Sequence, residues 1–386
     1  MSVQQVQTPL RIGVVSHDCF WPLKGGGGIR VYWVTKAMIQ RQHDVCVIAP
    51  LQTREGIEEE FGPIPVLSAG KLTRFVKFKE IKYIGLMARI FIRLLCQRFD
   101  VLYAHNAVAG LPTILISKLK KIPVVFDFDD LLTGYSKISF VYRFGPKMER
   151  WVAKRANLTI VNSRVVQQWC KKHGIHRTVI IRHGVDLSRF KAVDRERKYI
   201  TFTGGMEVND GVLLIPQAAQ EVLKEFPDEM FMMVGDGKDK QNLRQRVETL
   251  GLSRSFILKG WRDQGEIPGI LTESKIGLIT MLKVSATELS TRLSSYEYMA
   301  SGVPFITSDL DCSQEQVQES NAGILFENGN PQSLAQGILQ LLKDKTLWNT
   351  LSQNGQRYVK EHADWRKNAR AICLACEKVA SEEKID

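Results

Sequence analysis

The sequence predicts an α/β protein built from two doubly wound domains, each with a parallel sheet. Three observations lead to this prediction. Short runs rich in Val and Ile alternate with longer amphipathic segments, the runs are apolar throughout, and the whole rhythm restarts near residue 199. Continuous apolar runs between helices are typical of strands buried on both faces. A length of 386 residues suits two domains of ordinary size.

The first half begins with a strand at residues 11–16, a glycine-rich loop and a helical pattern at 29–41. The further strands expected in this half are 45–49, 101–104, 123–128, 158–162 and 179–181. We assign residues 1–190 to a first Rossmann-like domain, because strands and helices alternate throughout it.

A second set of strands follows residue 199. The expected strands are 199–203, 230–234, 256–258, 276–279 and 303–307. Residues 184–198 carry eight charges and are interpreted as a linker. A second Rossmann-like domain is placed at 191–362, and the helical segment 363–386 is expected to pack back on the first domain. Ligands of such sheets bind beyond the carboxyl ends of the strands, so the expected site is the cleft between the domains.

Composition excludes several classes of protein. Hydrophobic residues make up 44% and charged residues 24%, which is typical of a globular protein and not of a disordered or fibrous one. The net charge of +12 indicates an anionic partner: a phosphate-bearing ligand, a membrane surface or nucleic acid. Seven scattered cysteines fit a reducing compartment, and Cys373 and Cys376 are interpreted as helix-face residues rather than a metal or redox pair. With no apparent signal peptide or spanning segment, a cytoplasmic location is expected.

Four consecutive glycines, Gly25 to Gly28, follow the first strand and open a helix. Backbone amides without side chains can approach a phosphate, and a helix N-terminus adds partial positive charge. The loop matches neither the dinucleotide-binding nor the ATP-binding glycine pattern. We expect contact with a phosphate or a sugar, and a flexible turn is the alternative.

Further segments accompany this loop in a defined order. They are 25–31 (GGGGIRV), 43–47 (HDVCV), 100–106 (DVLYAHN), 182–186 (RHGVD) followed by Phe190, 260–261 (GW), 276–279 (IGLI) and 296–304 (YEYMASGVP). Together they resemble the motifs of the GT-B retaining glycosyltransferases of family 4, or glycosyl transferases group 1. The resemblance implies two Rossmann-like domains facing a central cleft. It also implies hexosyl transfer from a nucleotide-diphosphate sugar to a hydroxyl acceptor, with retention and without a metal ion or other cofactor.

The resemblance implies a donor site in the second domain. Relatives use the glutamate at position 297 to bind ribose hydroxyls, a task that suits a carboxylate because it accepts two hydrogen bonds. A solvent-exposed glutamate at a helix end is the alternative for Glu297. The expected donor-binding residues are Gly26, Gly27, Gly28, Gly205, Lys283, Arg292 and Glu297.

The chain departs from the family pattern where relatives carry an Arg and a Lys. Met206 and Asp210 occupy these places, and a carboxylate there would repel a diphosphate. We expect Arg292, which can bind phosphate with two parallel hydrogen bonds, and then Lys283 to replace the missing cations. For both residues the alternative is a surface charge.

The candidate catalytic residues are His105, Asp129 and Glu288. Relatives often have a second glutamate where this chain has Leu289, so a one-residue loop change would bring Glu288 to the donor sugar. Asp129 replaces a histidine that relatives place beside the transferred sugar. It is expected to orient a hydroxyl, while a metal-binding pair with Asp127 is the less favoured alternative. His105 is expected to donate a hydrogen bond or carry a proton, or else is a satisfied strand-end histidine.

A basic amphipathic stretch spans residues 71–98. Its cations are Lys71, Arg74, Lys77, Lys79, Lys82, Arg89, Arg93 and Arg98. Ile84, Met87, Phe91 and Leu94 recur at helical spacing and define one apolar face. Such a helix can lie on an anionic membrane, and the alternative is an ordinary helix packed on the sheet.

The favoured hypothesis is therefore a glycosyltransferase, with a nucleotide sugar and a hydroxyl acceptor as partners. The acceptor is expected to be a lipid-linked or polysaccharide precursor, with the enzyme peripheral on the inner face of the membrane. The alternative is a catalytically impaired GT-B protein that acts as a binding or assembly partner. Nucleic-acid binding rests on charge alone and is not expected.

Overall fold

The structure is a computed structural model that describes residues 8–23, 25–70, 79–129, 131, 139–193 and 195–382, with backbone only at 79–82 and 139–144. The chain forms two compact units. Unit 1 contains the residues up to Ile181 and those from Arg366 onward, and unit 2 contains Arg182–Trp365. The unit boundaries thus fall at 181/182 and 365/366, where the sequence interpretation placed them at 190/191 and 362/363.

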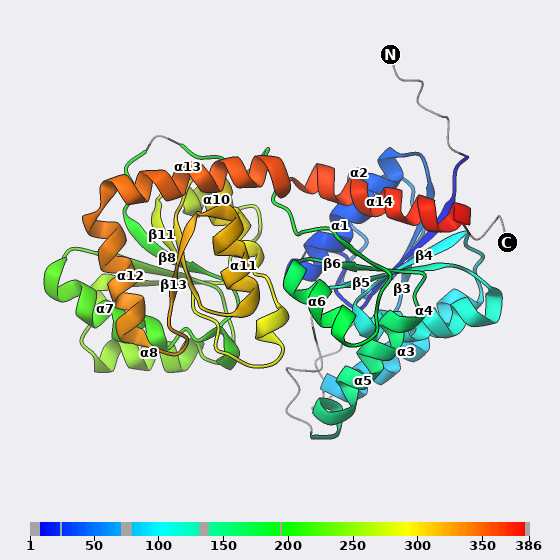
Figure 1. Cartoon of the computed structure of the whole chain (residues 1–386), viewed down its shortest axis with the longest axis horizontal. Coiled ribbons are helices and arrows are strands. Elements are labelled where there is room, and N and C mark those ends of the chain that lie inside the picture. Colours follow the sequence, from blue (N-terminus) through cyan, green and yellow to red (C-terminus); the bar gives the residue numbers. More distant parts are fainter. Residues whose placement is uncertain are drawn as a thin grey trace, which may run out of the picture. The chain divides into compact units, whose positions relative to one another are not determined.

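The described part of unit 1 is organised around one parallel sheet with the strand order β3-β2-β1-β4-β5-β6-β7 (Figure 1). The strands are β1 (Arg11–Ser16), β2 (Asp44–Ala49), β3 (Val66–Ser68), β4 (Val101–His105), β5 (Val124–Phe128), β6 (Leu158–Val161) and β7 (Thr178–Ile180). The helices are α1 (Gly25–Gln40), α2 (Ile57–Phe61), α3 (Lys79–Leu95), α4 (Asn106–Lys120), α5 (Ser139–Arg155) and α6 (Arg164–Lys172). The first six strands have the Rossmann order, which brings the ends of β1 and β4 side by side.

The last helix, α14 (Trp365–Glu382), contributes to the core of unit 1. Ile372, Cys373, Cys376 and Val379 are buried in one apolar cluster with residues of β1 and β2. Burial raises the pKa of the Cys376 thiol well above its usual range, so this side chain behaves as a small apolar group.

A buried carboxylate fastens α14 to unit 1. Glu377 is 4% exposed and accepts hydrogen bonds from Arg41 Nη2 at 2.9 Å and from His43 Nε2 at 2.8 Å. Burial alone would raise the pKa of Glu377, but the bonds from Arg41 and His43 outweigh it and lower the pKa. The charged form is therefore the one that the fold stabilises.

The Glu377→Gln variant is expected to lose about 1–3 kcal/mol of the stability of unit 1 at neutral pH. Because the pKa of Glu377 is lower in the folded state, this contribution is present above the unfolded pKa and is lost as the pH falls through the folded pKa. Calorimetric unfolding of wild type and variant should therefore converge in acid. Glu382→Gln, at an exposed position, is the control, and a difference that persists in acid would contradict the assignment.

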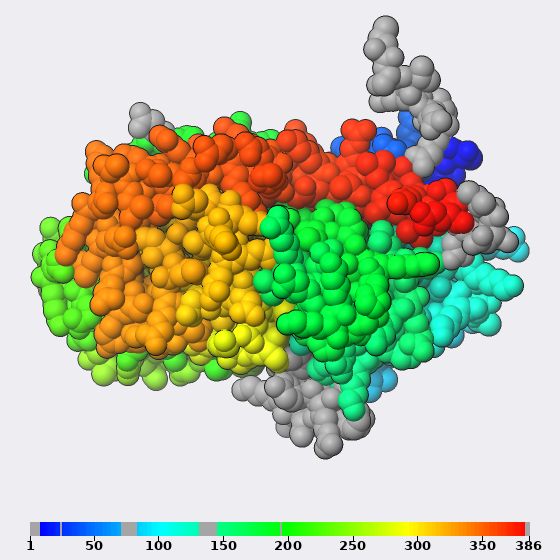
Figure 2. All heavy atoms as spheres, in the orientation of Figure 1, coloured from blue at the N-terminus to red at the C-terminus, as the bar shows by residue number. Residues whose placement is uncertain are grey.

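Unit 2 repeats the Rossmann arrangement, and its described residues contain a sheet of order β10-β9-β8-β11-β12-β13. The strands are β8 (Tyr199–Thr203), β9 (Met230–Val234), β10 (Phe256–Gly260), β11 (Ser274–Ile279), β12 (Phe305–Ser308) and β13 (Gly323–Phe326). The α-helices are α7 (Leu214–Glu225), α8 (Lys240–Thr249), α9 (Ile267–Thr272), α10 (Leu293–Ala300), α11 (Asp311–Ser320), α12 (Pro331–Lys343) and α13 (Lys345–His362), and the short 3-10 helices are η2 (Val208–Asp210), η3 (Ser253–Ser255) and η4 (Thr287–Leu289). Figure 2 shows the orange surface of α12 and α13 along one side of this unit.

The chain crosses from one unit to the other at residues 181/182 and again at 365/366. Within unit 2, the backbone just after the first crossing is hydrogen-bonded to the backbone just before the second. The backbone N–H of Val185 donates to Ala363 at 2.8 Å, and the N–H of Trp365 donates to Val185 at 3.3 Å. A Cβ atom at Gly184 would lie 2.7 Å from the backbone nitrogen of Trp365, so only glycine allows this approach. The segment interpreted as a linker is therefore anchored at its start.

Helix α3 differs from its expected orientation. Leu86, Ile90 and Leu94 form the buried face, whereas Ile84 is 65% exposed and Ile92 is 58% exposed. The expected apolar face was therefore wrong at Ile84, because the helix is apolar on two sides and the sequence spacing fits both. Lys71, Arg74 and Lys77 lie outside the described residues, as do the side chains of Lys79 and Lys82.

Candidate active site

Polar side chains meet at the carboxyl edge of the unit 1 sheet. His17 and Asp18 follow β1, His105 ends β4 and Asp129 follows β5. Ser16 of β1 is in register with His105, so the residues that follow β1 are carried to the end of β4. This edge is where doubly wound sheets bind ligands.

His105 lies between two carboxylates. Its Nδ1 is 3.2 Å from Oδ2 of Asp18, and its Nε2 is 3.3 Å from Oδ2 of Asp129. Burial alone would lower the pKa of His105, but the hydrogen bonds and charges of Asp129 and Asp18 raise it to about 10. At neutral pH His105 is therefore an imidazolium ion, which favours a role as a hydrogen-bond donor over that of a proton carrier.

Asp129 is held in place by two asparagines. Asn162 Nδ2 donates to the backbone oxygen of Asp129 at 3.0 Å, and the backbone N–H of Asp129 donates to Oδ1 of Asn106 at 3.2 Å. Asn106 has a φ of 61°, a left-handed conformation that asparagine tolerates better than most residues. The carboxylate is thus oriented toward His105 by the backbone around it.

Asp127 takes part in a different interaction from Asp129. Its carboxylate accepts two hydrogen bonds from Arg30, at 2.7 and 3.0 Å, and a further bond from the hydroxyl of Tyr103. Arg30 and Asp127 are both fully buried. With its oxygens committed to Arg30, Asp127 is unsuited to the metal-binding pair with Asp129, and it instead ties α1 to β5.

The glycine loop begins α1 and lies against the same cluster. A Cβ atom at Gly27 would be 2.3 Å from Oδ2 of Asp18 and 2.9 Å from Cε1 of His105, and one at Gly28 would be 3.0 Å from the oxygen of Cys19. Glycine is required at 27 because any side chain would displace these groups. The first turn of α1, which includes Gly26, contains no acidic residue, so its unsatisfied N–H groups favour an anion.

In unit 2, Glu297 of α10 presents a partly buried carboxyl group. Its Oε1 accepts a hydrogen bond of 2.7 Å from Nε2 of Gln264. Burial raises the pKa of Glu297 despite the opposing effects of Gln264 and the charge of Arg189. The group is therefore not a helix-end glutamate surrounded by solvent, and a ligand that donates hydrogen bonds would stabilise its charged form.

The structure explains why Met206 and Asp210, rather than an Arg and a Lys, follow β8. Met206 is buried in the apolar core, and Asp210 closes η2 by accepting a hydrogen bond of 2.9 Å from the N–H of Glu207. Nη2 of Arg292 lies 2.5 Å from Oδ1 of Asp210. Arg292 thus offsets the charge of Asp210, and Gly205 is exposed beside this pair, where a Cβ atom would lie 2.9 Å from Asp210.

Lys283 and Glu288 form another ion pair, with 2.9 Å between Nζ and Oε1. Leu289 is buried, and Glu288 is 29% exposed at its side chain. The described partner of Glu288 is therefore Lys283.

Comparison with known proteins identifies the family. The model for Glycosyltransferase Family 4 matches residues 24–189, and the model for Glycosyl transferases group 1 matches residues 197–344. The two matches cover both units. The chain belongs to the group 1 glycosyltransferases. The predicted family, the α/β fold class with two Rossmann-like domains and the transferase activity of class EC 2.4 are thereby confirmed.

Characterised relatives of this glycosyltransferase are distant. It is 24% identical to the UDP-Gal:alpha-D-GlcNAc-diphosphoundecaprenol alpha-1,3-galactosyltransferase of Escherichia coli, over 67% of this chain and 70% of that protein. It is also 24% identical to the phosphatidyl-myo-inositol mannosyltransferase of Mycobacterium tuberculosis, over 96% and 97%. The structure of Anabaena Alr3699/HepE in complex with UDP-glucose matches with a TM-score of 0.76 at 19% identity, over 96% of this chain and 100% of that one.

Three residues of the candidate sites were missed from the sequence: His17 and Asp18 in unit 1, and Gln264, the partner of Glu297, in unit 2. His17 and Asp18 directly follow a buried strand, and that position alone is a usable signal because strand ends meet at one edge of a parallel sheet. Gln264 follows β10 by only a few residues, but a single amide in a loop gives no comparable signal.

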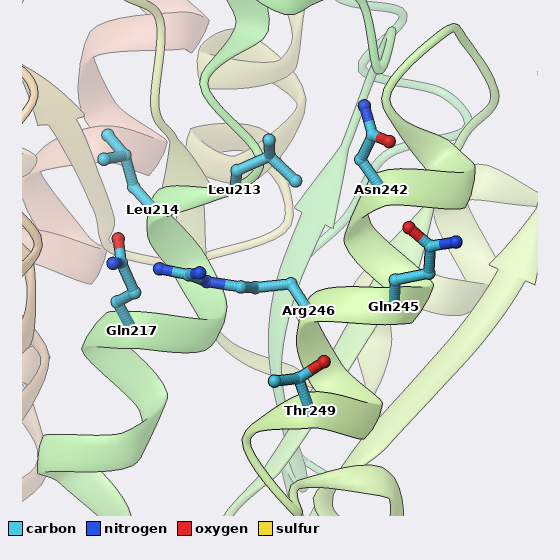
Figure 3. A pocket seen from close by; sticks show the side chains of 7 residues that line it. All are labelled: Leu213, Leu214, Gln217, Asn242, Gln245, Arg246 and Thr249. Atoms are coloured by element: carbon cyan, nitrogen blue, oxygen red, sulfur yellow. The ribbon is translucent and has the colours of Figure 1, made fainter.

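A separate open pocket of about 480 Å³ lies between α7 and α8 of the glycosyltransferase (Figure 3). Figure 3 shows Arg246 reaching from α8 toward Gln217 on α7. The lining residues are Leu213, Leu214, Gln217, Asn242, Gln245, Arg246 and Thr249. The pocket contains no residue of the predicted site.

The Asp129→Asn variant is expected to lower the pKa of His105 by about 1–3 units, because it removes one of the two carboxylates that stabilise the imidazolium ion. An NMR titration of the His105 ring proton measures this shift directly. Asp44→Asn, at an exposed aspartate, should leave the titration unchanged. An unaltered pKa in Asp129→Asn would show that Asp18 alone sets it.

Among the described residues, no helix has both the length and the apolar character needed to cross a bilayer.

Proposed function

We propose that this glycosyltransferase transfers a hexose from a UDP-sugar to a hydroxyl group of a lipid-linked or glycolipid acceptor, with retention of configuration and without a metal ion. The observation that supports it most directly is the partly buried carboxyl group of Glu297, hydrogen-bonded to Gln264 at 2.7 Å. Ribose hydroxyls would donate to this carboxylate and stabilise its charge.

Similarity supports the choice of donor and acceptor. The E. coli relative is named for UDP-Gal, and the HepE structure is a complex with UDP-glucose. The same E. coli name includes a diphosphoundecaprenol acceptor, and the mycobacterial name includes phosphatidyl-myo-inositol. Both acceptors carry a lipid, so we assign a lipid-bearing acceptor to this chain.

The ion pairs of Arg292 and Lys283 determine how these two cations could bind the donor phosphates. Arg292 and Lys283 each already have a carboxylate partner, so a diphosphate bound by them must share or displace Asp210 or Glu288. In unit 1, the unsatisfied N–H groups at the start of α1 offer a separate region of positive potential to an anionic group, which supports transfer without a metal ion.

A lipid-bearing acceptor calls for a membrane-facing surface, and we assign it to α3 and α4. These helices pack side by side in unit 1. Their exposed apolar side chains are Ile84, Ile92, Leu95, Leu115 and Leu119. Every charged residue in segments 83–98 and 106–121 is a Lys or an Arg, because neither segment contains Asp or Glu. An apolar surface within a cationic one suits the inner face of an anionic membrane.

Flotation with vesicles containing phosphatidylglycerol tests this surface. The wild type should float at low ionic strength, and the Ile84→Glu/Ile92→Glu variant should remain at the bottom of the gradient. Leu374→Glu, at an exposed leucine of α14, is the matched control and should float like the wild type. Equal flotation of all three proteins would place the membrane contact elsewhere, and no flotation of the wild type would end the assignment.

The proposed reaction is tested by incubating the protein with UDP-hexoses and membrane lipid extracts, with and without a chelator. Transfer to lipid that continues with the chelator supports the proposal, and the anomeric coupling in the product gives its stereochemistry. Calorimetric titration with UDP, GDP and ADP should show preference for UDP. No binding of any of the three would instead favour a non-catalytic binding partner.

A further inference from the structure

Two histidines and an aspartate of unit 1 bring three metal-ligating atoms together. One ring nitrogen of His17, one of His105 and a carboxylate oxygen of Asp18 all lie within 4.8 Å of one another. Two of the separations are 3.7 Å, from His17 Nδ1 to Asp18 Oδ2, and 3.2 Å, from His105 Nδ1 to the same oxygen. Ligands of a tetrahedral zinc ion are about 3.3 Å apart when the bonds are about 2.0 Å long.

Each of the two imidazole rings also has a second partner of the kind that orients metal-bound histidines. Nε2 of His105 faces Oδ2 of Asp129 at 3.3 Å, and the ring of His17 forms a hydrogen bond with the backbone of His105. In metal sites a carboxylate or backbone oxygen holds the far ring nitrogen and leaves the near one for the metal. His17 is 6% exposed, and its Nδ1 has no hydrogen-bond partner among the described residues.

The site can be reached from the solvent through Asp18. Asp18 is 29% exposed, so an ion can approach from its side. Glycine at position 27 lets the start of α1 pack directly against Asp18 and His105, because a Cβ atom there would lie 2.3 Å from Asp18 Oδ2. Three protein ligands leave a coordination position for water or another ligand.

A second cluster of similar residues serves as a contrast. His43, Cys373 and Glu377 also lie close together, but Arg41 already donates to Glu377 at 2.5 and 2.9 Å. The N–H of Leu10 donates to Nδ1 of His43, so its Nε2 is the proton donor to Glu377. The guanidinium would repel a cation, and the cluster is complete without one.

We propose that His17, Asp18 and His105 form a binding site for a divalent transition-metal ion, with Zn²⁺ as the best fit to two imidazoles and one carboxylate. The inference stands apart from the proposed transfer reaction, which is not routed through this ion. A ring nitrogen binds a metal ion through its lone pair, so Nδ1 of His105 faces the ion without a proton in the bound state.

Titration of the chelator-treated full chain with ZnCl₂ tests the site. We expect one Zn²⁺ per chain. His17→Gln and Asp18→Asn should each lose this binding, and Asp129→Asn should weaken it by about 10–100-fold. His176→Gln, at an exposed histidine, is the control. Unchanged stoichiometry in both ligand variants would overturn the proposal.

X-ray absorption of the Zn²⁺-loaded wild type tests the same proposal without a variant. Nitrogen and oxygen ligands alone are expected. A sulfur ligand would overturn the assignment to His17, Asp18 and His105, because none of the three supplies sulfur. Absence of zinc binding to the wild type would do the same.

Discussion

The Glu297→Gln variant is expected to bind UDP about 30–1,000-fold more weakly than the wild type, a loss of roughly 2–4 kcal/mol. A carboxylate can accept a charge-assisted hydrogen bond at each oxygen from two neighbouring hydroxyls, whereas the amide has only one accepting oxygen. Isothermal titration calorimetry measures the change. Glu266→Gln, two residues beyond Gln264 and with 55% of its side chain exposed, is the matched control.

The same variant should not lose stability, which separates a binding role from a structural one. Burial raises the pKa of Glu297, so the protonated form is favoured by folding and this contribution is lost as the pH rises through the raised pKa. A neutral glutamine removes the cost of a partly buried charge. A melting temperature equal to or above that of the wild type, together with lost UDP binding, is the expected combination. Lost binding with a lower melting temperature, or retained binding, would contradict the assignment.

The Arg30→Met variant is expected to destabilise unit 1 by about 3–5 kcal/mol, because it leaves the carboxylate of Asp127 buried without its ion-pair partner. Arg30 and Asp127 are fully buried, and their two hydrogen bonds measure 2.7 and 3.0 Å. Such a loss is a large fraction of the stability of an ordinary domain. Calorimetric unfolding should show the transition of unit 1 shifted strongly downward in temperature.

A double variant shows whether the unpaired charge is the cause. Arg30→Met/Asp127→Asn should recover more than half of the loss, because no buried charge remains and Tyr103 still has a hydrogen-bond acceptor. Arg11→Met, whose side chain is 43% exposed and lies 3.3 Å from Asp44, should cost less than about 1 kcal/mol. Equal effects of Arg30→Met and the double variant would mean that packing, not charge, dominates.

The sequence predicted the central strands because they are buried on both faces and therefore apolar without interruption. It missed β3 and β13, which are short strands at the ends of their sheets. An edge strand of three or four residues is paired on one side only, and so few residues give no distinct pattern.

The candidate site was predictable where motifs or strand ends mark it, as at His105 and Glu297. The ion pairs were not, because they join residues far apart in the chain. Arg292 and Asp210 are separated by 82 positions, and neither residue type indicates a specific partner. The likeness to the family likewise could not show that Met206 is part of the apolar core, since side-chain burial depends on the packing around η2.

The placement of α14 has a consequence for synthesis of the protein on the ribosome. Unit 1 is encoded first, but its core is completed by Ile372, Cys373, Cys376 and Val379, which are translated after all of unit 2. At 5–20 residues per second, the ribosome needs roughly 10–40 s to translate the intervening segment. During that interval the nascent first half has an uncovered apolar surface beside β1 and β2. A chaperone that shields nascent chains should therefore remain associated with this half until the final helix emerges.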